Sequence, residues 1–144
     1  MSHSAPFEER AEFPARLAAL RDTAAFAQAF CDRNGIGRDH ALRLVFVIEE
    51  LFTNTVRHGY GEESDEPIRI VLAIGDRHVS LLFEDFAPRY DPLEQLSGEP
   101  ANLGAPVDAR PVGGLGLYVL GQLVAGARYA YEEGSNRLWL EVPL

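Results

Sequence analysis

A proline-rich stretch without regular periodicity divides this chain into two periodic parts. Residues 86–112 contain five of the nine prolines and repeat apolar residues at neither helical nor strand spacing. Loops of this length inside a compact domain are usually functional or mobile. Because 144 residues fit one domain, the parts on either side must pack into a single fold. We therefore predict one domain over residues 1–144, with a functional or mobile loop at 86–112 that holds at most a helical turn near Pro92–Leu96.

The part before the loop carries two helical patterns followed by two strand patterns. In each helical pattern the apolar residues recur on one stripe, and the second helix is predicted to stop at Gly59. The strand patterns are β-branched or apolar with partial alternation, and Gly75-Asp76 between them is a hairpin signal. We predict helices over residues 15–33 and 39–58, strands over 68–74 and 78–84, and a short strand near 7–13.

The part after the loop is typical of one helix and a closing hairpin. The pair Gly113-Gly114 opens a helix predicted over 115–124, and Gly134-Ser135 lies between strands predicted over 127–133 and 137–142. Helices between groups of antiparallel strands indicate an α+β protein. The predicted fold class is therefore α+β, a two-layer sandwich with helices on one face of a mixed, mostly antiparallel sheet.

The balance of charges limits the partners of this chain. Its formal net charge of −9 repels nucleic-acid backbones and anionic lipid surfaces at long range. We expect no direct contact with nucleic acid and an attraction to basic protein partners. No apolar run approaches the ~20 residues of a membrane span, so no membrane insertion is expected. With one cysteine, Cys31, and no basic-then-apolar leader, the expected location is cytoplasmic.

Polar side chains interrupt the second predicted helix near its end. Glu50 and Asn54 are spaced i, i+4 and so share one helix face, with Arg57 and His58 a further turn along. A solvated helical face would explain this spacing. The rest of the helix is strongly apolar, however, which favours polar groups that border a cleft. This face is the first candidate for a functional site.

A carboxylate ends the second predicted strand. Asp85 follows an apolar run and precedes a loop that begins with Phe86, Ala87 and Pro88. A carboxylate placed there can accept a hydrogen bond from an exocyclic amine such as that of adenine, or it can simply cap a turn. Tyr90, like Tyr60, either lines a nucleotide pocket or packs beside the loop. Trp139 is expected in the core.

A glycine cluster opens the last predicted helix. Glycines let the backbone approach a ligand closely, and the first N–H groups of a helix bind anions even on an acidic protein. An ordinary turn is the alternative. The cluster lacks the preceding strand of a dinucleotide-binding fingerprint and the lysine of a P-loop, which excludes both folds. The candidate phosphate-binding residues are Gly113, Gly114, Leu115, Gly116 and Leu117.

In this order and with these gaps, the three elements resemble the Bergerat (GHKL) ATPase superfamily over about residues 42–143. The nearest match is its anti-sigma factor serine-protein kinase branch. Residues 49–60 look like its N-box, residues 85–92 its adenine box, and residues 113–117 its glycine box. Residues 86–112 would then form an ATP lid.

The resemblance assigns a role to each matching position. It implies that Glu50 is the general base, Asn54 a magnesium ligand, Arg57 a phosphate-contacting residue and Asp85 the adenine-binding aspartate. The nucleotide-binding set would also include His58, Ala87, Tyr90 and the glycine box. The chain has Ala87 where the family commonly has glycine. It lacks the threonine that many relatives place before the last strand, and Ser135 is the nearest hydroxyl.

The implied function is that of an ATP- and magnesium-dependent protein serine/threonine kinase. It would act as an anti-sigma factor, with a sigma factor and an anti-anti-sigma protein of the STAS type as partners, and would phosphorylate the second of these. The relatives often dimerise, so a homodimer is compatible with the resemblance. The alternative is a nucleotide-gated partner-switch module with little or no kinase activity.

Overall fold

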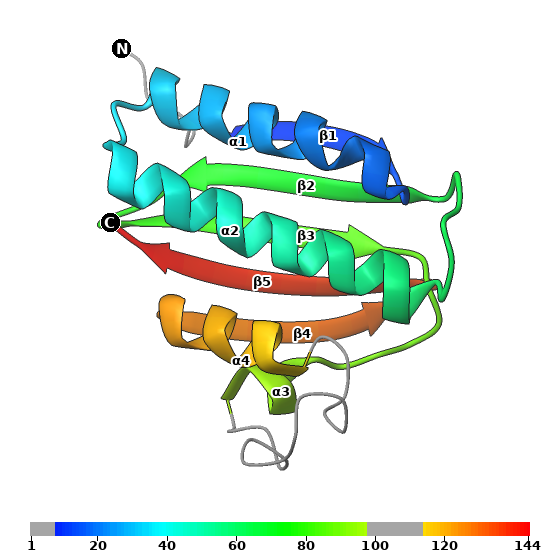
Figure 1. Cartoon of the computed structure of the whole chain (residues 1–144). Helices are drawn as coiled ribbons and strands as arrows, with labels where there is room; N and C mark the ends of the chain where they lie inside the picture. The colour runs from blue at the N-terminus through cyan, green and yellow to red at the C-terminus, as the bar shows by residue number, and fades with distance from the viewer. Residues whose placement is uncertain (1–7, 98–113) are drawn as a thin grey trace.

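The computed structural model describes residues 8–97 and 114–144. Five strands form one sheet in the order β1-β2-β3-β5-β4, and each of the four pairings is antiparallel (Figure 1). The strands are β1 (Glu8–Pro14), β2 (Pro67–Ile74), β3 (His78–Asp85), β4 (Gly126–Glu132) and β5 (Ser135–Pro143). The helices are η1 (Leu17–Ala19), α1 (Leu20–Arg33), α2 (Arg38–Asn54), η2 (Thr55–Gly59), α3 (Leu93–Ser97) and α4 (Gly114–Leu123). The α+β prediction is confirmed, at the fully antiparallel end of the expected range.

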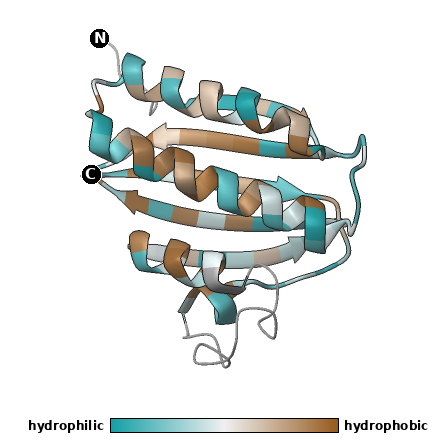
Figure 2. Ribbon diagram, in the orientation of Figure 1, coloured by the Kyte–Doolittle hydropathy of each residue, from teal (hydrophilic) through white to brown (hydrophobic). Residues whose placement is uncertain are grey.

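The helices of residues 8–97 and 114–144 all pack against one face of the sheet, and the opposite face, which none of them covers, is called the uncovered face (Figure 1). Alternate residues of the central strands point toward the helices and are buried, among them Ile70, Leu81 and Leu140. They meet the apolar stripe of α2, which includes Leu44 and Ile48. Figure 2 shows these hydrophobic stretches along α2 and the central strands. This core holds the ends of α2, β3 and β5 in fixed relative positions.

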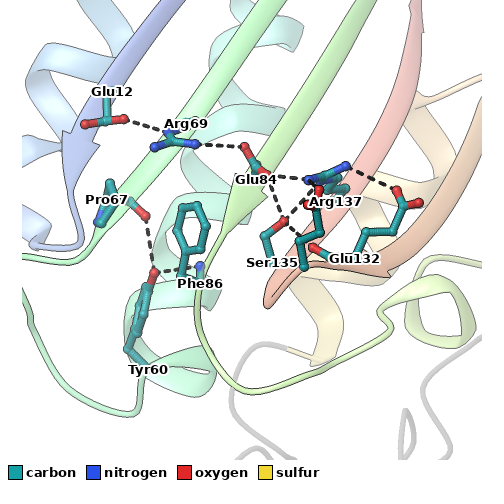
Figure 3. A network of polar contacts seen from close by, with 10 residues as sticks. Glu12, Tyr60, Pro67, Arg69, Glu84, Phe86, Glu132, Ser135 and Arg137 are labelled. Atoms are coloured by element: carbon teal, nitrogen blue, oxygen red, sulfur yellow. Dashed lines mark hydrogen bonds and ion pairs between the residues drawn. The ribbon is translucent and has the colours of Figure 1, made fainter.

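The uncovered face of the sheet carries a ladder of alternating charges. Arg69 pairs with Glu12 at 2.7 Å and with Glu84 at 3.7 Å, and Arg137 pairs with Glu84 at 3.1 Å (Figure 3). These residues are direct cross-strand neighbours. Such a row keeps polar groups on the solvent face of the sheet.

Trp139 lies on this uncovered face, so the expectation that it belongs to the core is wrong. Its neighbours Leu138 and Leu140 are buried, and strand alternation therefore turns Trp139 outward. The guanidinium of Arg128 on the next strand covers the indole, with 3.8 Å between Cζ and the ring centroid. The indole ring is thus covered by a stacked cation and not by the hydrophobic core.

The end of α2 departs from α-helical geometry. From Thr55 to Gly59 the chain forms a π turn, in which the Tyr60 N–H donates to the Thr55 carbonyl at 2.8 Å. The Tyr60 hydroxyl then accepts the Phe86 N–H at 2.8 Å and donates to the Pro67 carbonyl at 3.2 Å (Figure 3). Burial raises the pKa of Tyr60 to about 12. These contacts fasten the end of α2 to the start of β2 and the end of β3.

Most of the predicted lid, together with Gly113, lies outside the described residues. Within the described part of 86–112, the predicted helical turn near Pro92–Leu96 is observed as α3. No helix within 8–97 and 114–144 is long and apolar enough to cross a membrane.

Candidate functional site

The ends of α2 and β3 and the start of β5 meet the beginning of α4 around a small hollow of about 30 Å³. Four of the residues predicted for the site line it: Asn54, Asp85, Tyr90 and Leu117. The polar lining also includes Thr55, Tyr129 and Asn136. A hollow of this size holds a water molecule but no nucleotide. Its walls must therefore separate before a larger ligand enters.

Asp85 is the most buried ionisable group of the site, with 7% of its surface exposed. Its Oδ1 accepts the Ala87 N–H at 3.0 Å and the Asn136 side-chain amide at 2.9 Å. Its Oδ2 accepts the Thr55 hydroxyl at a longer 3.3 Å. Burial raises the pKa of Asp85, while these bonds from Asn136, Ala87 and Thr55 act in the opposite direction. The site thus offers a carboxylate that accepts hydrogen bonds, and a ligand at this point must donate one.

Glu50 lies against the first turn of α4. A Cβ atom built on Gly116 would lie 2.0 Å from Glu50 Oε1, so only a glycine leaves room for this carboxylate. Asn54 follows one helical turn after Glu50 and lines the hollow, as their i, i+4 spacing predicts. The packing of α2 on α4 therefore brings together the carboxylate, the amide and the glycine-rich helix start.

The other predicted residues are placed as follows. Gly114 and Leu115 open α4. Ala87 is buried, and its methyl group is directed at the space left by the missing side chain of Gly59, 3.4 Å from a Cβ built there. Arg57 and His58 are exposed on the π turn and do not line the hollow. Their nucleotide-binding role stays a prediction.

Sequence reasoning missed Asn136. It named Ser135 as the nearest hydroxyl, but strand alternation places Ser135 on the uncovered face, where its hydroxyl donates to Glu84 Oε2 at 2.8 Å. Asn136 lies on the helix-covered face, directly opposite Asp85 in the β3–β5 register. The signal in the sequence was a polar residue at the alternate strand positions that Leu138 and Leu140 also occupy. Placing Asn136 opposite Asp85 required the register between the two strands.

Asn54 provides the kind of ligand that magnesium accepts in nucleotide sites. Magnesium prefers oxygen donors and usually combines one or two protein ligands with substrate phosphates and water. The Asn54 side chain lies beside the hollow and one turn from Glu50, which fits this pattern. Within 8–97 and 114–144, no group of three or more His, Cys, Asp or Glu residues is placed to hold a metal without such a substrate.

The sheet, its single helical layer and the meeting of α2, β3 and α4 define an ATPase domain of the Bergerat type. The chain belongs to the histidine kinase-like ATPase domain family, which matches residues 13–142. Serine-protein kinase RsbW of Bacillus thuringiensis (strain Al Hakam) is 30% identical over 109 residues, covering 74% of this chain and 67% of that protein. RsbW of Bacillus anthracis matches to the same extent. The resemblance to the anti-sigma factor serine-protein kinase branch is confirmed.

Solved structures share the fold. The RsbU and RsbW domains of Rv1364c from Mycobacterium tuberculosis match with a TM-score of 0.65 and 21% identity, covering 96% of this chain and 32% of that one. A chain of the SiaB–SiaC complex from Pseudomonas aeruginosa matches with a TM-score of 0.64 and 15% identity, covering 93% of this chain and 88% of that one. The family and the names of its relatives support ATP-dependent kinase activity.

Proposed function

We propose that this protein is an ATP-dependent serine-protein kinase and anti-sigma factor that phosphorylates an anti-anti-sigma partner of the STAS type. The observation that carries the proposal is the close approach of Glu50 to Gly116. It holds a carboxylate beside the helix start that resembles the family's phosphate-binding box. The names of the RsbW relatives support the same class of reaction.

Each side chain has a distinct task in this proposal. Asp85 accepts a hydrogen bond from the adenine amine, and the first N–H groups of α4 bind phosphate oxygens. Asn54 would hold magnesium, which when bound neutralises charge on the phosphates. The substrate serine oxygen attacks the γ-phosphorus, the bond to the bridging oxygen breaks, ADP leaves, and the serine proton passes to Glu50. Positioning and electrostatics supply most of the rate enhancement.

Substitution of Glu50 tests this role. Glu50→Gln is nearly isosteric and leaves Asp85 and Asn54 in place, so ATP-magnesium binding should stay near normal. Phosphoryl transfer to a STAS-type protein, followed with labelled γ-phosphate, should fall about 10²- to 10⁴-fold. Glu49→Gln is the matched control, because it removes a neighbouring carboxylate of the same helix. Normal transfer by Glu50→Gln with loss in Glu49→Gln would move the base to Glu49.

A nucleotide-gated switch module is the second candidate, and the small size of the hollow favours it. Tyr90, inside the predicted lid segment 86–112, and Leu117, just after it, both line a space too small for a nucleotide. To enter this space, a nucleotide must therefore move lining residues that also form part of the protein surface. A wild-type protein that transfers no phosphate while ATP alters its affinity for a sigma factor would establish the module.

A homodimer and a cytoplasmic location stay predictions. Light scattering tests whether the protein is a homodimer.

A further inference from the structure

Asn136 uses its whole side-chain amide to join three parts of the site. Its Nδ2 donates to Asp85 Oδ1 at 2.9 Å, to the Ala87 carbonyl at 3.0 Å and to the Pro88 carbonyl at 3.2 Å. Its Oδ1 accepts the Tyr90 N–H at 3.0 Å and the Tyr129 hydroxyl at 2.5 Å. One buried side chain on β5 thus holds the end of β3, the segment that follows it, and β4.

These contacts allow only one orientation of the amide. The partners of Nδ2 are all acceptors, and the Tyr90 backbone N–H beside Oδ1 can only donate. Exchanging the oxygen and nitrogen of Asn136 would place like groups against each other at Asp85, at the two carbonyls and at the Tyr90 N–H, and only the Tyr129 hydroxyl could adapt. Asn136 therefore presents a donor to Asp85 in a fixed direction.

The fixed donor determines which oxygen of Asp85 stays available. Oδ1 already accepts from both Asn136 and Ala87. In the described part of the chain, Oδ2 has only the longer contact with the Thr55 hydroxyl. The carboxylate thus keeps acceptor capacity on Oδ2, beside the hollow that Asp85 and Thr55 both line.

We propose that Asn136 is a positioning residue for base recognition, and this rests on the proposed function. By holding Asp85 Oδ1 and residues 87–90, it directs Oδ2 as an acceptor toward the ligand. A purine with an exocyclic amine at that point donates to Oδ2, whereas one with a carbonyl there meets a second acceptor. Asn136 thereby sets the preference for ATP over GTP without touching the base.

A matched pair of substitutions tests the donor. Threonine and valine have the same shape and both favour strands, but only threonine can donate to Asp85. Asn136→Thr should bind ATP within a few-fold of wild type, measured by calorimetry. Asn136→Val should bind about 10- to 100-fold more weakly, as expected for the loss of a hydrogen bond to a charged group, and its ATP:GTP preference should shrink. Equal ATP affinities in the two variants would overturn the inference.

Asn136→Asp gives a signature that a purely structural role cannot produce. The introduced carboxyl can still accept from Tyr90 and Tyr129, but it opposes Asp85 unless one of the two carries a proton. Its affinity for ATP, relative to wild type at each pH, should rise as the pH falls from 8 to 6, because the protonated carboxyl again donates to Asp85. A ratio that stays flat or falls would contradict the proposal.

Other ionisable groups do not confuse this comparison. Burial raises the pKa of Tyr60, Tyr90 and Tyr129 around the site, so they keep their protons over this range. Glu84, on the opposite face of β3, and the exposed His58 are common to all the proteins compared. Gln28→Glu, the same amide-to-carboxyl change on the exposed side of α1, should show a flat ratio.

The outcomes separate the two proposals. If wild-type protein binds no ATP, the proposed function fails and this inference fails with it. If wild type binds ATP and Asp85→Asn does not, while Asn136→Thr and Asn136→Val bind alike, only the role of Asn136 is lost. Thermal melts identify unfolded variants, and the strand-compatible Thr/Val pair decides the matter should Asn136→Asp not fold.

Discussion

The charged form of Asp85 favours ligand binding but lowers the stability of the folded state. Its pKa is raised by burial, so the folded state holds the Asp85 proton to a higher pH than the unfolded chain does. Stability therefore falls as the pH rises from the unfolded pKa, near 3.9, through the higher folded one. A charged carboxylate is thus retained in the site at the expense of folding free energy.

Asp85→Asn should consequently lose ATP binding and keep or gain stability. The amide still offers an oxygen to Ala87 and Asn136, but it loses the charge and can turn a competing N–H₂ to the base, weakening binding by about 2 kcal/mol or more. At pH 7 its melting temperature should equal or exceed that of wild type, and the difference should vanish near pH 4. Calorimetry and thermal melts measure the two effects. Wild-type ATP affinity would remove Asp85 from the site.

Gly116→Ala should impair chemistry without unfolding the protein. The new methyl group collides with Glu50 Oε1, the mobile end of a flexible side chain, which can swing aside at little cost. The carboxylate would then leave its position beside the start of α4. We expect a melting temperature close to that of wild type and phosphoryl transfer reduced about 10²-fold, the lower end of the worth of a general base. Unchanged transfer would show that the position of Glu50 is irrelevant to the reaction.

The site residues that sequence analysis identified can all be located from the pattern of their neighbours along the chain. Glu50 and Asn54 share a helix face by their spacing, and Asp85 ends an apolar strand. Asn136 and Thr55 enter the site through pairing across 51 and 30 residues of sequence separation. No local period encodes such a pairing, because the strand register that creates it depends on the packed sheet.

At the scale of elements, the sequence predicted the helices and strands well and the end of α2 poorly. Periodicity carried the helical pattern to residue 58, whereas the α-helix ends at Asn54 and a π turn follows. The pattern continues because Thr55 and Val56 are buried in the π turn as well. The turn is stabilised instead by tertiary contacts, notably those of Tyr60 with Phe86 and Pro67, that a single element does not reveal.

The contact between α3 and α4 yields a prediction at the same scale. A Cβ on Gly121 would lie 1.7 Å from the Leu96 carbonyl oxygen, a backbone atom that cannot move without displacing α3. Gly121→Ala should therefore destabilise the fold by about 1–3 kcal/mol. In Gly37→Ala, the control, the new methyl group meets nothing within 4 Å. It should cost less than about 1 kcal/mol, as a weakened helix cap. Denaturant unfolding compares them, and equal values would refute the close packing of α3 on α4.

At the scale of the whole molecule, the site depends on the assembled fold. Asn54, Asp85, Leu117 and Asn136 come from α2, β3, α4 and β5, and no subset of these elements presents all four. The sheet order places β5 between β3 and β4, so the last strand of the chain completes a site begun by its second helix. A ligand of this site should consequently bind the folded chain and not the unfolded one.

Binding of this kind makes the thermal stability of the whole domain depend on nucleotide concentration. At 100 times its dissociation constant, a ligand that binds only the native state adds about 2.7 kcal/mol, which for a domain of this size corresponds to roughly 5–10 °C in melting temperature. ATP-magnesium should raise the wild-type melting temperature by this amount, and GTP at the same concentration by much less. Asp85→Asn should lose most of the shift, while Glu50→Gln should keep it because its defect is chemical. An equal shift in Asp85→Asn would place the nucleotide elsewhere on the molecule, since Asp85 would then contribute nothing to the bound state.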